Sequence, residues 1–269
     1  MNSQRRIPGS IVLIFAAALF LFDGCSTVPV TGRKQLNLIS AGEETQLGLT
    51  SFDQLKKETP INHDPAINDQ VQRVGKRVAA VAGKDLPDAK WEFVVFESKE
   101  ANAFCLPGGK VGVYTGILTV TKDDAGLATV IGHEVGHAVA HHGAERMSEA
   151  LIMQGGGELV GLSLSTASPL TQQAAMLAYG AGTKMGRELP HSRSQESEAD
   201  HIGLIYMARA GYDPKAAVEF WQRFAALTGQ QGNASWLSQF LSTHPVDEVR
   251  IKQLKQWLPE AEAVRAKTH

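Results

Sequence analysis

The sequence has little cysteine and little net charge. It holds two cysteines among 269 residues, and its formal net charge at neutral pH is −2. Two cysteines cannot build the disulfide framework of a small secreted domain, and a near-neutral chain has no electrostatic bias towards nucleic acid. Because solenoid-type repeats are also lacking, we expect one domain, stabilised by a hydrophobic core and by any bound metal.

Long apolar runs are scarce, and the one near the N-terminus is short. Two arginines precede the run Ile11–Phe22, and Cys25 follows it closely. Basic, apolar and then small residues are the order of a secretory signal, and the run is short for a membrane span. We therefore predict a signal peptide over residues 1–25 and one domain over residues 26–269. An uncleaved N-terminal anchor is the alternative.

Cys25 lies where bacterial lipoproteins carry the cysteine that receives lipid, and its surroundings resemble their lipobox. Gly24 fits the small residue before that cysteine, whereas Asp23 departs from the usual pattern. Ser26, in place of aspartate, implies sorting to an outer membrane. The resemblance implies an exported, periplasmic lipoprotein anchored through Cys25. Cys105 would then lack a partner, and its apolar neighbours favour a buried thiol.

Hydrophobic periodicity predicts a mostly α fold with a small β-sheet, of the α+β class. Ser40 and Glu43 form a capping-box signature, which opens a helix to about Lys57. Strands are predicted over residues 91–98 and 110–116, which are rich in β-branched and aromatic residues, with a Pro-Gly-Gly turn between them. The other expected helices span residues 64–81, 124–162, 171–184, 195–210, 214–227 and 245–257.

The stretch HEVGHAVAHH, His133–His142, places four histidines and one glutamate in ten residues. Residues four apart on a helix are separated by about 400° of rotation and about 6 Å of rise, so His133 and His137 can reach one metal ion. Glu134 lies at the edge of the same face, where it can reach a water without being a ligand. This is the H-E-x-x-H zinc motif, and it predicts one Zn²⁺ per chain with Glu134 as general base.

A catalytic zinc needs a third protein ligand and an open position for water. His141 and His142 are expected to be flanking polar residues or residues that contact a ligand, and not ligands themselves, because no carboxylate lies between His137 and His141. Glu196 and Asp200 are four apart in SRSQESEADHIG and share a helix face, while Glu198 points to the opposite side. One carboxylate of the pair could bind zinc and the other could hold a ligand histidine. An acidic, solvent-facing first turn of a helix is the equal alternative.

Four separated motifs carry a family resemblance. HEVGHAVAHHGAER, SRSQESEAD, NAFCLPGGKVGVYTGIL and STHPVDEVRI together resemble the HtpX and CAAX-prenyl-endopeptidase family of zinc metallopeptidases, in its exported, BepA/LoiP-like lipoprotein branch. The resemblance covers about Val28–Leu254 and implies a gluzincin-type fold with an edge strand that can pair with an extended substrate. It implies that Glu196 is the third zinc ligand and Asp200 the partner of a ligand histidine. It also places His244 and Arg250 close to the zinc, with catalytic roles.

The expected activity is that of a zinc endopeptidase acting on polypeptides, by family analogy misfolded or unassembled envelope proteins. His244 could donate a hydrogen bond in the transition state or occupy the fourth zinc position. We expect no helical repeats after the peptidase domain, unlike in BepA-like members. An assembly factor or chaperone with an occluded zinc site, or a structural zinc protein, would be the alternative, but a binding protein has no use for a base such as Glu134.

Overall fold

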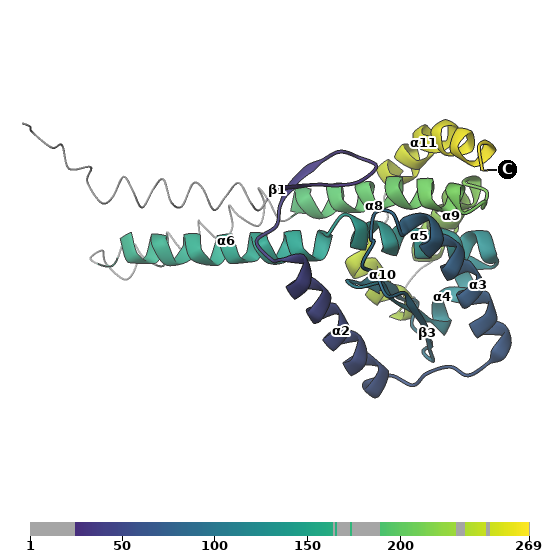
Figure 1. Cartoon of the computed structure of the whole chain (residues 1–269), viewed down its shortest axis with the longest axis horizontal. Coiled ribbons are helices and arrows are strands. Elements are labelled where there is room, and N and C mark those ends of the chain that lie inside the picture. Colours follow the sequence, from purple (N-terminus) through teal and green to yellow (C-terminus); the bar gives the residue numbers. More distant parts are fainter. Residues whose placement is uncertain are drawn as a thin grey trace, which may run out of the picture.

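The computed structural model describes residues 25–163, 165, 173, 189–229, 235–245 and 248–268. These residues form a mostly helical domain with a small sheet, as predicted (Figure 1). Residues 1–24, which hold nearly all of the predicted signal peptide, lie outside the described part, as does nearly all of the helix expected over residues 171–184. Within that part, no helix combines the length and apolar character that a membrane span requires.

A short hairpin and two helices come first in the chain. Strands β1 (Cys25–Thr27) and β2 (Lys34–Leu36) pair antiparallel, and the sequence had not indicated them. Helix α2 (Ala41–Glu58) begins at the predicted capping box, and α3 (Pro65–Ala82) begins at an aspartate cap followed by proline. Both helices match their predicted bounds to about one residue, because their starts rely on local side chains.

The sheet has three strands in the order β3–β5–β4. Strand β3 (Glu92–Phe96) runs parallel to β5 (Lys110–Tyr114), and β4 (Ala103–Leu106) runs antiparallel to β5. The predicted Pro-Gly-Gly turn joins β4 to β5 and not the two predicted strands, and its two glycines take φ of 83° and 79°. The sequence did not predict β4, because four residues are too few to show an alternating pattern.

The rest of the described chain is helical. Its elements are α4 (Thr115–Thr121), α5 (Asp124–Val139), α6 (His142–Ser163), α8 (Leu189–Arg209), α9 (Lys215–Gly229), η2 (Ser235–Leu237), α10 (Ser238–Thr243) and α11 (Glu248–Ala266). The prediction of one helix over residues 124–162 is wrong. His141 has a φ of 52°, a left-handed conformation that separates α5 from α6. Helix α6 then extends away from the body of the domain (Figure 1).

Helices α5 and α8 approach each other closely because glycines line their contact. A Cβ atom added to Gly203 of α8 would lie 2.7 Å from the backbone nitrogen of His133. One added to Gly136 of α5 would lie 2.8 Å from the carbonyl oxygen of Ala199. Only residues without a Cβ allow this approach. The contact places the polar side chains at the start of α8 opposite the histidines of α5.

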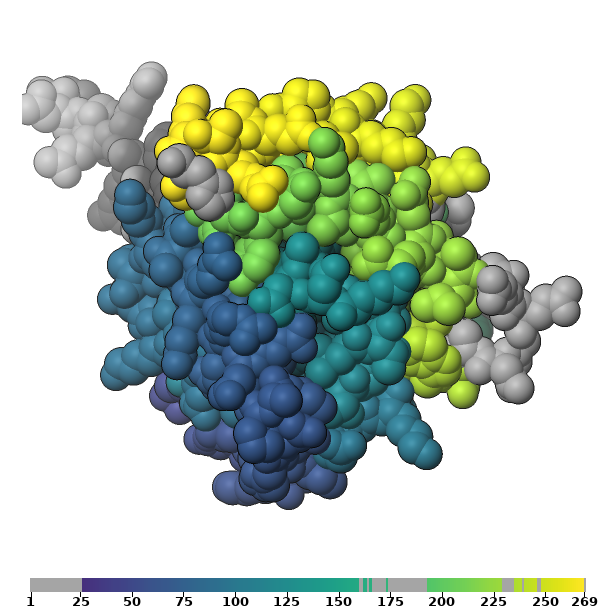
Figure 2. Space-filling model, turned by 90° about the vertical axis from the view of Figure 1, so that its right-hand side faces the viewer, coloured from purple at the N-terminus to yellow at the C-terminus, as the bar shows by residue number. Residues whose placement is uncertain are grey.

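The core is built around α5, which is buried almost throughout because α3, β4, α8 and α9 all contact it. Helix α9 contributes an aromatic cluster to this core, in which Trp221 and Phe224 pack with Phe240 of α10. Figure 2 shows α11 (yellow) lying across α8 (green). The polar residues of α5 and α8 are therefore enclosed in a rigid, largely apolar setting.

Candidate metal centre

Four side chains bring possible ligand atoms to one point. His133 and His137 of α5, Glu196 of α8 and His244 after α10 each offer one atom, and all four atoms lie within 4.8 Å of one another. The Nε2 atoms of the two α5 histidines are 3.1 Å apart, and they lie 3.3 and 3.2 Å from the two carboxylate oxygens of Glu196. Two histidines and a glutamate are a donor set of catalytic zinc sites. The three residues expected as ligands therefore lie together.

The ring of His244 points into the same group. Its Nδ1 atom lies 2.9 Å from Oε2 of Glu196 and 3.2 Å from Nε2 of His133, and its Nε2 atom lies 3.4 Å from Oε1 of Glu134. The ring also packs on Phe240, with 4.6 Å between the ring centroids. His244 is therefore placed as a fourth donor in this conformation.

Glu134 lies beside the donors without joining them. Its side chain is buried, and its Oε1 atom makes no hydrogen bond to any residue that the structure describes. Burial raises the pKa of this carboxyl. A buried carboxylate with a free oxygen next to a metal site has the position that a general base requires.

The protonation states of His137 and Glu196 fit the binding of a divalent cation. Burial lowers the pKa of His137 well below its ordinary value, which keeps a lone pair free for a metal. Burial alone would raise the pKa of Glu196, but hydrogen bonds with His133, His137 and His244 lower it, so this group stays ionised. The carboxylates of Asp200 and Glu196 raise the pKa of His133 to about 9 despite its burial, so a metal must displace a proton from this ring.

The carboxylate of Asp200 contacts the ring nitrogen of His133 that does not face the other donors. The Nδ1 atom of His133 lies 2.9 Å from Oδ1 of Asp200, and Arg250 of α11 donates two hydrogen bonds of 2.8 Å to the same carboxylate. The Arg250 guanidinium also lies over the ring of Trp221, 4.0 Å from its centroid. The closeness of this carboxylate favours the tautomer of His133 with its proton on Nδ1, which leaves Nε2 for the metal. Asp200 and Arg250 both lie where the family resemblance implied.

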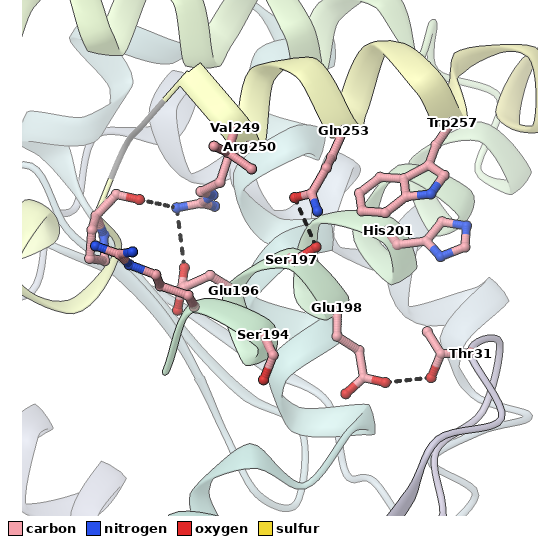
Figure 3. A pocket seen from close by; sticks show the side chains of 12 residues that line it. Thr31, Ser194, Glu196, Ser197, Glu198, His201, Val249, Arg250, Gln253 and Trp257 are labelled. Carbon is pink, nitrogen blue, oxygen red and sulfur yellow. Dashed lines mark hydrogen bonds and ion pairs between the residues drawn. The ribbon is translucent and has the colours of Figure 1, made fainter. Parts of the chain in front are cut away.

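The second ring nitrogen of His137, Nδ1, contacts His142. Nδ1 of His137 lies 2.8 Å from Nδ1 of His142, and Nε2 of His142 lies 3.0 Å from Oε2 of Glu198. Glu198 leaves α8 on the other side from Glu196, as predicted, and it accepts a hydrogen bond from Thr31 (Figure 3). His142 was expected to be a flanking polar residue or a residue that contacts a ligand, and it contacts the ligand His137. Glu198 had no predicted role.

The remaining predicted neighbours lie further from the donors. His141 lies 2.7 Å from a carboxylate oxygen of Glu44 on α2 and contacts no donor. Cys105, expected to be a buried thiol, is half-buried in β4, and burial raises the pKa of its thiol. A pocket of about 430 Å³ between the N-terminal leader (residues 26–40), α8 and α11 opens beside Glu196 and Arg250 (Figure 3).

Comparison with known proteins places this geometry in a family. The model of peptidase family M48 matches residues 65–258. The mitochondrial metalloendopeptidase OMA1 of Schizosaccharomyces pombe is 36% identical over 94% of this chain and 72% of its own length, and that of Saccharomyces cerevisiae is 32% identical over 94% and 75%. The beta-barrel assembly-enhancing protease of Escherichia coli K12 is 29% identical over 92% of this chain, which spans 52% of that protein. Similar proteins thus include mitochondrial and bacterial proteases.

Proposed function

The chain belongs to peptidase family M48, and from this membership we propose the residues that carry its chemistry and the substrates on which it acts. It is a zinc metalloendopeptidase, and its relatives include proteins named metalloendopeptidase and protease. We assign His133, His137 and Glu196 as the residues that hold the zinc ion. The observation that carries this assignment is the convergence of their three ligand atoms beside the buried carboxylate of Glu134, whose Oε1 atom accepts no hydrogen bond from the described residues.

The chain's own residues move the protons of the reaction. Bound Zn²⁺ supplies Lewis acidity, which polarises a scissile carbonyl and lowers the pKa of water. Glu134 accepts the proton of the attacking water and then donates it to the nitrogen of the leaving amine. Its raised pKa favours the first transfer, because burial makes the protonated form of this carboxyl less costly than the ionised form. Asp200 and Arg250 keep His133 in the tautomer that binds metal.

His244 has a role that the sequence left open between a transition-state donor and a fourth ligand. Its Nδ1 atom lies among the donors, which favours the fourth position in this conformation. The ring must then move away before a substrate and a water can share the site. We expect His244→Ala to bind zinc as before and to cleave faster than wild type. A fall in kcat of about 10² to 10³ would instead assign the donor role.

The proposed substrates are misfolded or unassembled proteins of the bacterial cell envelope, reached by a periplasmic lipoprotein on the outer membrane. An apolar run followed by Cys25 supports the location, as does the similarity to a beta-barrel assembly-enhancing protease. Strand β4 supports the substrate class, since it lies at the sheet edge next to α5 and pairs with β5 on one side. An unfolded segment can add to such an edge as a strand, whereas a folded protein cannot.

A lipoprotein assembly factor that binds without cleaving is the second candidate, because His244 completes a set of four donors. The test uses the purified zinc-loaded chain and one outer-membrane porin, offered unfolded in urea-diluted buffer and folded in detergent micelles. We expect cleavage of the unfolded porin alone, and none by a Glu134→Gln variant. Binding of the unfolded porin without cleavage would support the assembly factor. Equal cleavage of both forms would overturn the preference for misfolded proteins.

A further inference from the structure

In each of the two histidines of the zinc motif, the Nδ1 atom contacts another side chain. These side chains belong to different parts of the chain. His133 contacts the carboxylate of Asp200, which Arg250 holds. His137 contacts His142, and His142 contacts the carboxylate of Glu198. The second chain of contacts does not end within the helices, because Glu198 is in turn held by the N-terminal leader.

We propose that Arg33, Glu198 and His142 are positioning residues, which orient the ligand His137 through a relay of hydrogen bonds that starts in the leader. This role depends on the proposed zinc ligands. It does not depend on which proteins the enzyme cleaves or on where in the cell it lies. Through this relay, the leader segment between β1 and β2 helps to orient a ligand of the metal centre.

The hydrogen bonds of the relay fix one tautomer at each ring. Because Nε2 of His137 faces the other donors, its proton resides on Nδ1 and is donated to Nδ1 of His142, 2.8 Å away. His142 then carries its own proton on Nε2 and donates it to Glu198 at 3.0 Å. Each donor meets an acceptor, so both neutral rings are held in one orientation. Carboxylates that fix ligand histidines in this way strengthen metal binding.

Arg33 is the residue of the leader that donates a hydrogen bond to Glu198 and to a second carboxylate beside it. Its Nε atom donates to Oε2 of Glu198 at 2.7 Å, and its two terminal nitrogens donate to both oxygens of Glu145 at 2.6 and 3.0 Å. Gln195 donates to the same Glu145 at 2.7 Å. One guanidinium thus joins a carboxylate of α8 to a carboxylate of α6, with both carboxylates buried. Without Arg33, two buried carboxylates would lose their only cationic partner in the leader.

The break between α5 and α6 makes the relay possible. On a continuous helix, residues five apart are rotated by about 140°, so His137 and His142 would point in different directions. The left-handed His141 redirects the chain and brings the two rings together, with 4.9 Å between their centroids. His142 has no exposed surface, and its two ring nitrogens are both used by the relay.

Zinc affinity of the purified chain tests the proposal without any substrate. The change is Arg33→Met, and its matched control is Arg73→Met, which removes another arginine–carboxylate pair, to Asp124 at the far end of α5. The probe is Zn²⁺ itself, in competition with a chromogenic chelator. We expect Arg33→Met to weaken zinc binding about 10-fold or more and Arg73→Met to leave it unchanged, in line with losses of about 10- to 100-fold for groups that orient ligands.

Variants of His142 separate positioning from packing. Leucine at this position keeps much of the volume but no hydrogen bond, whereas asparagine is smaller but keeps an acceptor near the place of Nδ1. We expect His142→Leu to hold zinc about 10- to 100-fold more weakly than wild type, and His142→Asn to recover part of the loss. Should a variant not fold in excess zinc, as judged by circular dichroism, Glu198→Gln replaces it. Zinc affinities equal to that of Arg73→Met in the folded variants would overturn the relay.

Discussion

Two glutamates in the first half of α8 lie two residues apart and have different partners. Residues two apart on a helix point about 200° away from each other, so Glu196 faces the histidines of α5 while Glu198 faces the leader (Figure 3). Both are buried carboxylates, and each is kept ionised by hydrogen bonds. Orientation, and not residue type, therefore decides which of them is placed to bind metal.

Replacing Glu196 by alanine should remove the metal, since a third ligand is lost and two histidines hold zinc weakly. The matched control is Ser197→Ala, one residue along, whose hydroxyl contacts Gln253 and no donor. Metal analysis of the dialysed proteins should find about one zinc per chain in wild type and the control, and little in Glu196→Ala. Full occupancy of Glu196→Ala would remove this residue from the ligand set.

Glu198 should stabilise the fold in a way that depends on pH. Burial alone would raise its pKa, but hydrogen bonds from His142, Thr31 and Arg33 lower it from 4.5 to about 2. A lowered folded-state pKa adds stability above the unfolded pKa, and this stability is lost as pH falls towards the folded value. The loss of unfolding free energy caused by Glu198→Gln should therefore be largest above about pH 5 and should shrink towards pH 2. Urea titrations of the metal-free proteins check this, and a loss that is constant with pH would contradict it.

At the residue scale, the H-E-x-x-H spacing was enough to predict that His133 and His137 meet, because a regular helix fixes their relation. The approach of Glu196 could come only from the family resemblance, since spacing left it even with a surface helix. The pairing of His142 with His137 and the contact of Arg33 with Glu198 could not be predicted. Their contacts depend on a left-handed His141 and on a leader that folds back over residues distant in sequence.

At the scale of elements, the contact between α5 and α8 sets the geometry of the metal site. Glycines at this contact let the backbones touch, as at Gly203, whose added Cβ would lie 2.7 Å from the nitrogen of His133 and 2.8 Å from the carbonyl carbon of Gly132. Backbone atoms cannot move aside as a flexible side chain can. The two helices must therefore separate if Gly203 gains a side chain.

Gly203→Ala should lower both stability and zinc affinity. Overpacking of this kind costs about 1–3 kcal/mol, and the added separation carries Glu196 away from the histidines. The control is Gly143→Ala in α6, where an added Cβ meets nothing within 4 Å. This control should be neutral or slightly stabilising, because alanine favours a helix over glycine. Thermal unfolding and zinc competition measure the two effects, and equal behaviour of the two variants would refute the role of the close contact.

The element bounds that the sequence predicted well are those with local signals. The Ser40–Glu43 capping box and the Asp64–Pro65 start fixed α2 and α3. The junction between α5 and α6 carries neither glycine nor proline, so the pattern predicted one helix where there are two. Strand β4 has four residues and owes its place to pairing with β5, which a short sequence window does not show.

At the scale of the whole molecule, the leader joins the proposed membrane anchor to the metal centre. Cys25 begins β1, which pairs with β2, and Arg33 lies just before β2 and holds Glu198. If Cys25 carries lipid, the peptidase domain lies close to the membrane surface, because few residues separate the anchor from the domain.

Cys25→Ala should release the protein from membranes and abolish labelling by fatty acid, since the acceptor thiol of the lipid is lost. Cys105→Ala is the matched control, because its thiol lies in β4 with a pKa raised by burial, and it should remain membrane-bound. Fractionation of cells that express each variant gives the result. A Cys25→Ala protein that stays with the membranes would favour an uncleaved N-terminal anchor.

The central claim is that one zinc ion, held by the two α5 histidines and Glu196, works with Glu134 as the base. The most direct test measures zinc content and casein cleavage together in the wild type and in Glu134→Gln. The account predicts about one zinc per chain in both proteins and cleavage by the wild type alone, because the ligands remain while the base is lost. Appreciable cleavage by zinc-loaded Glu134→Gln would contradict it.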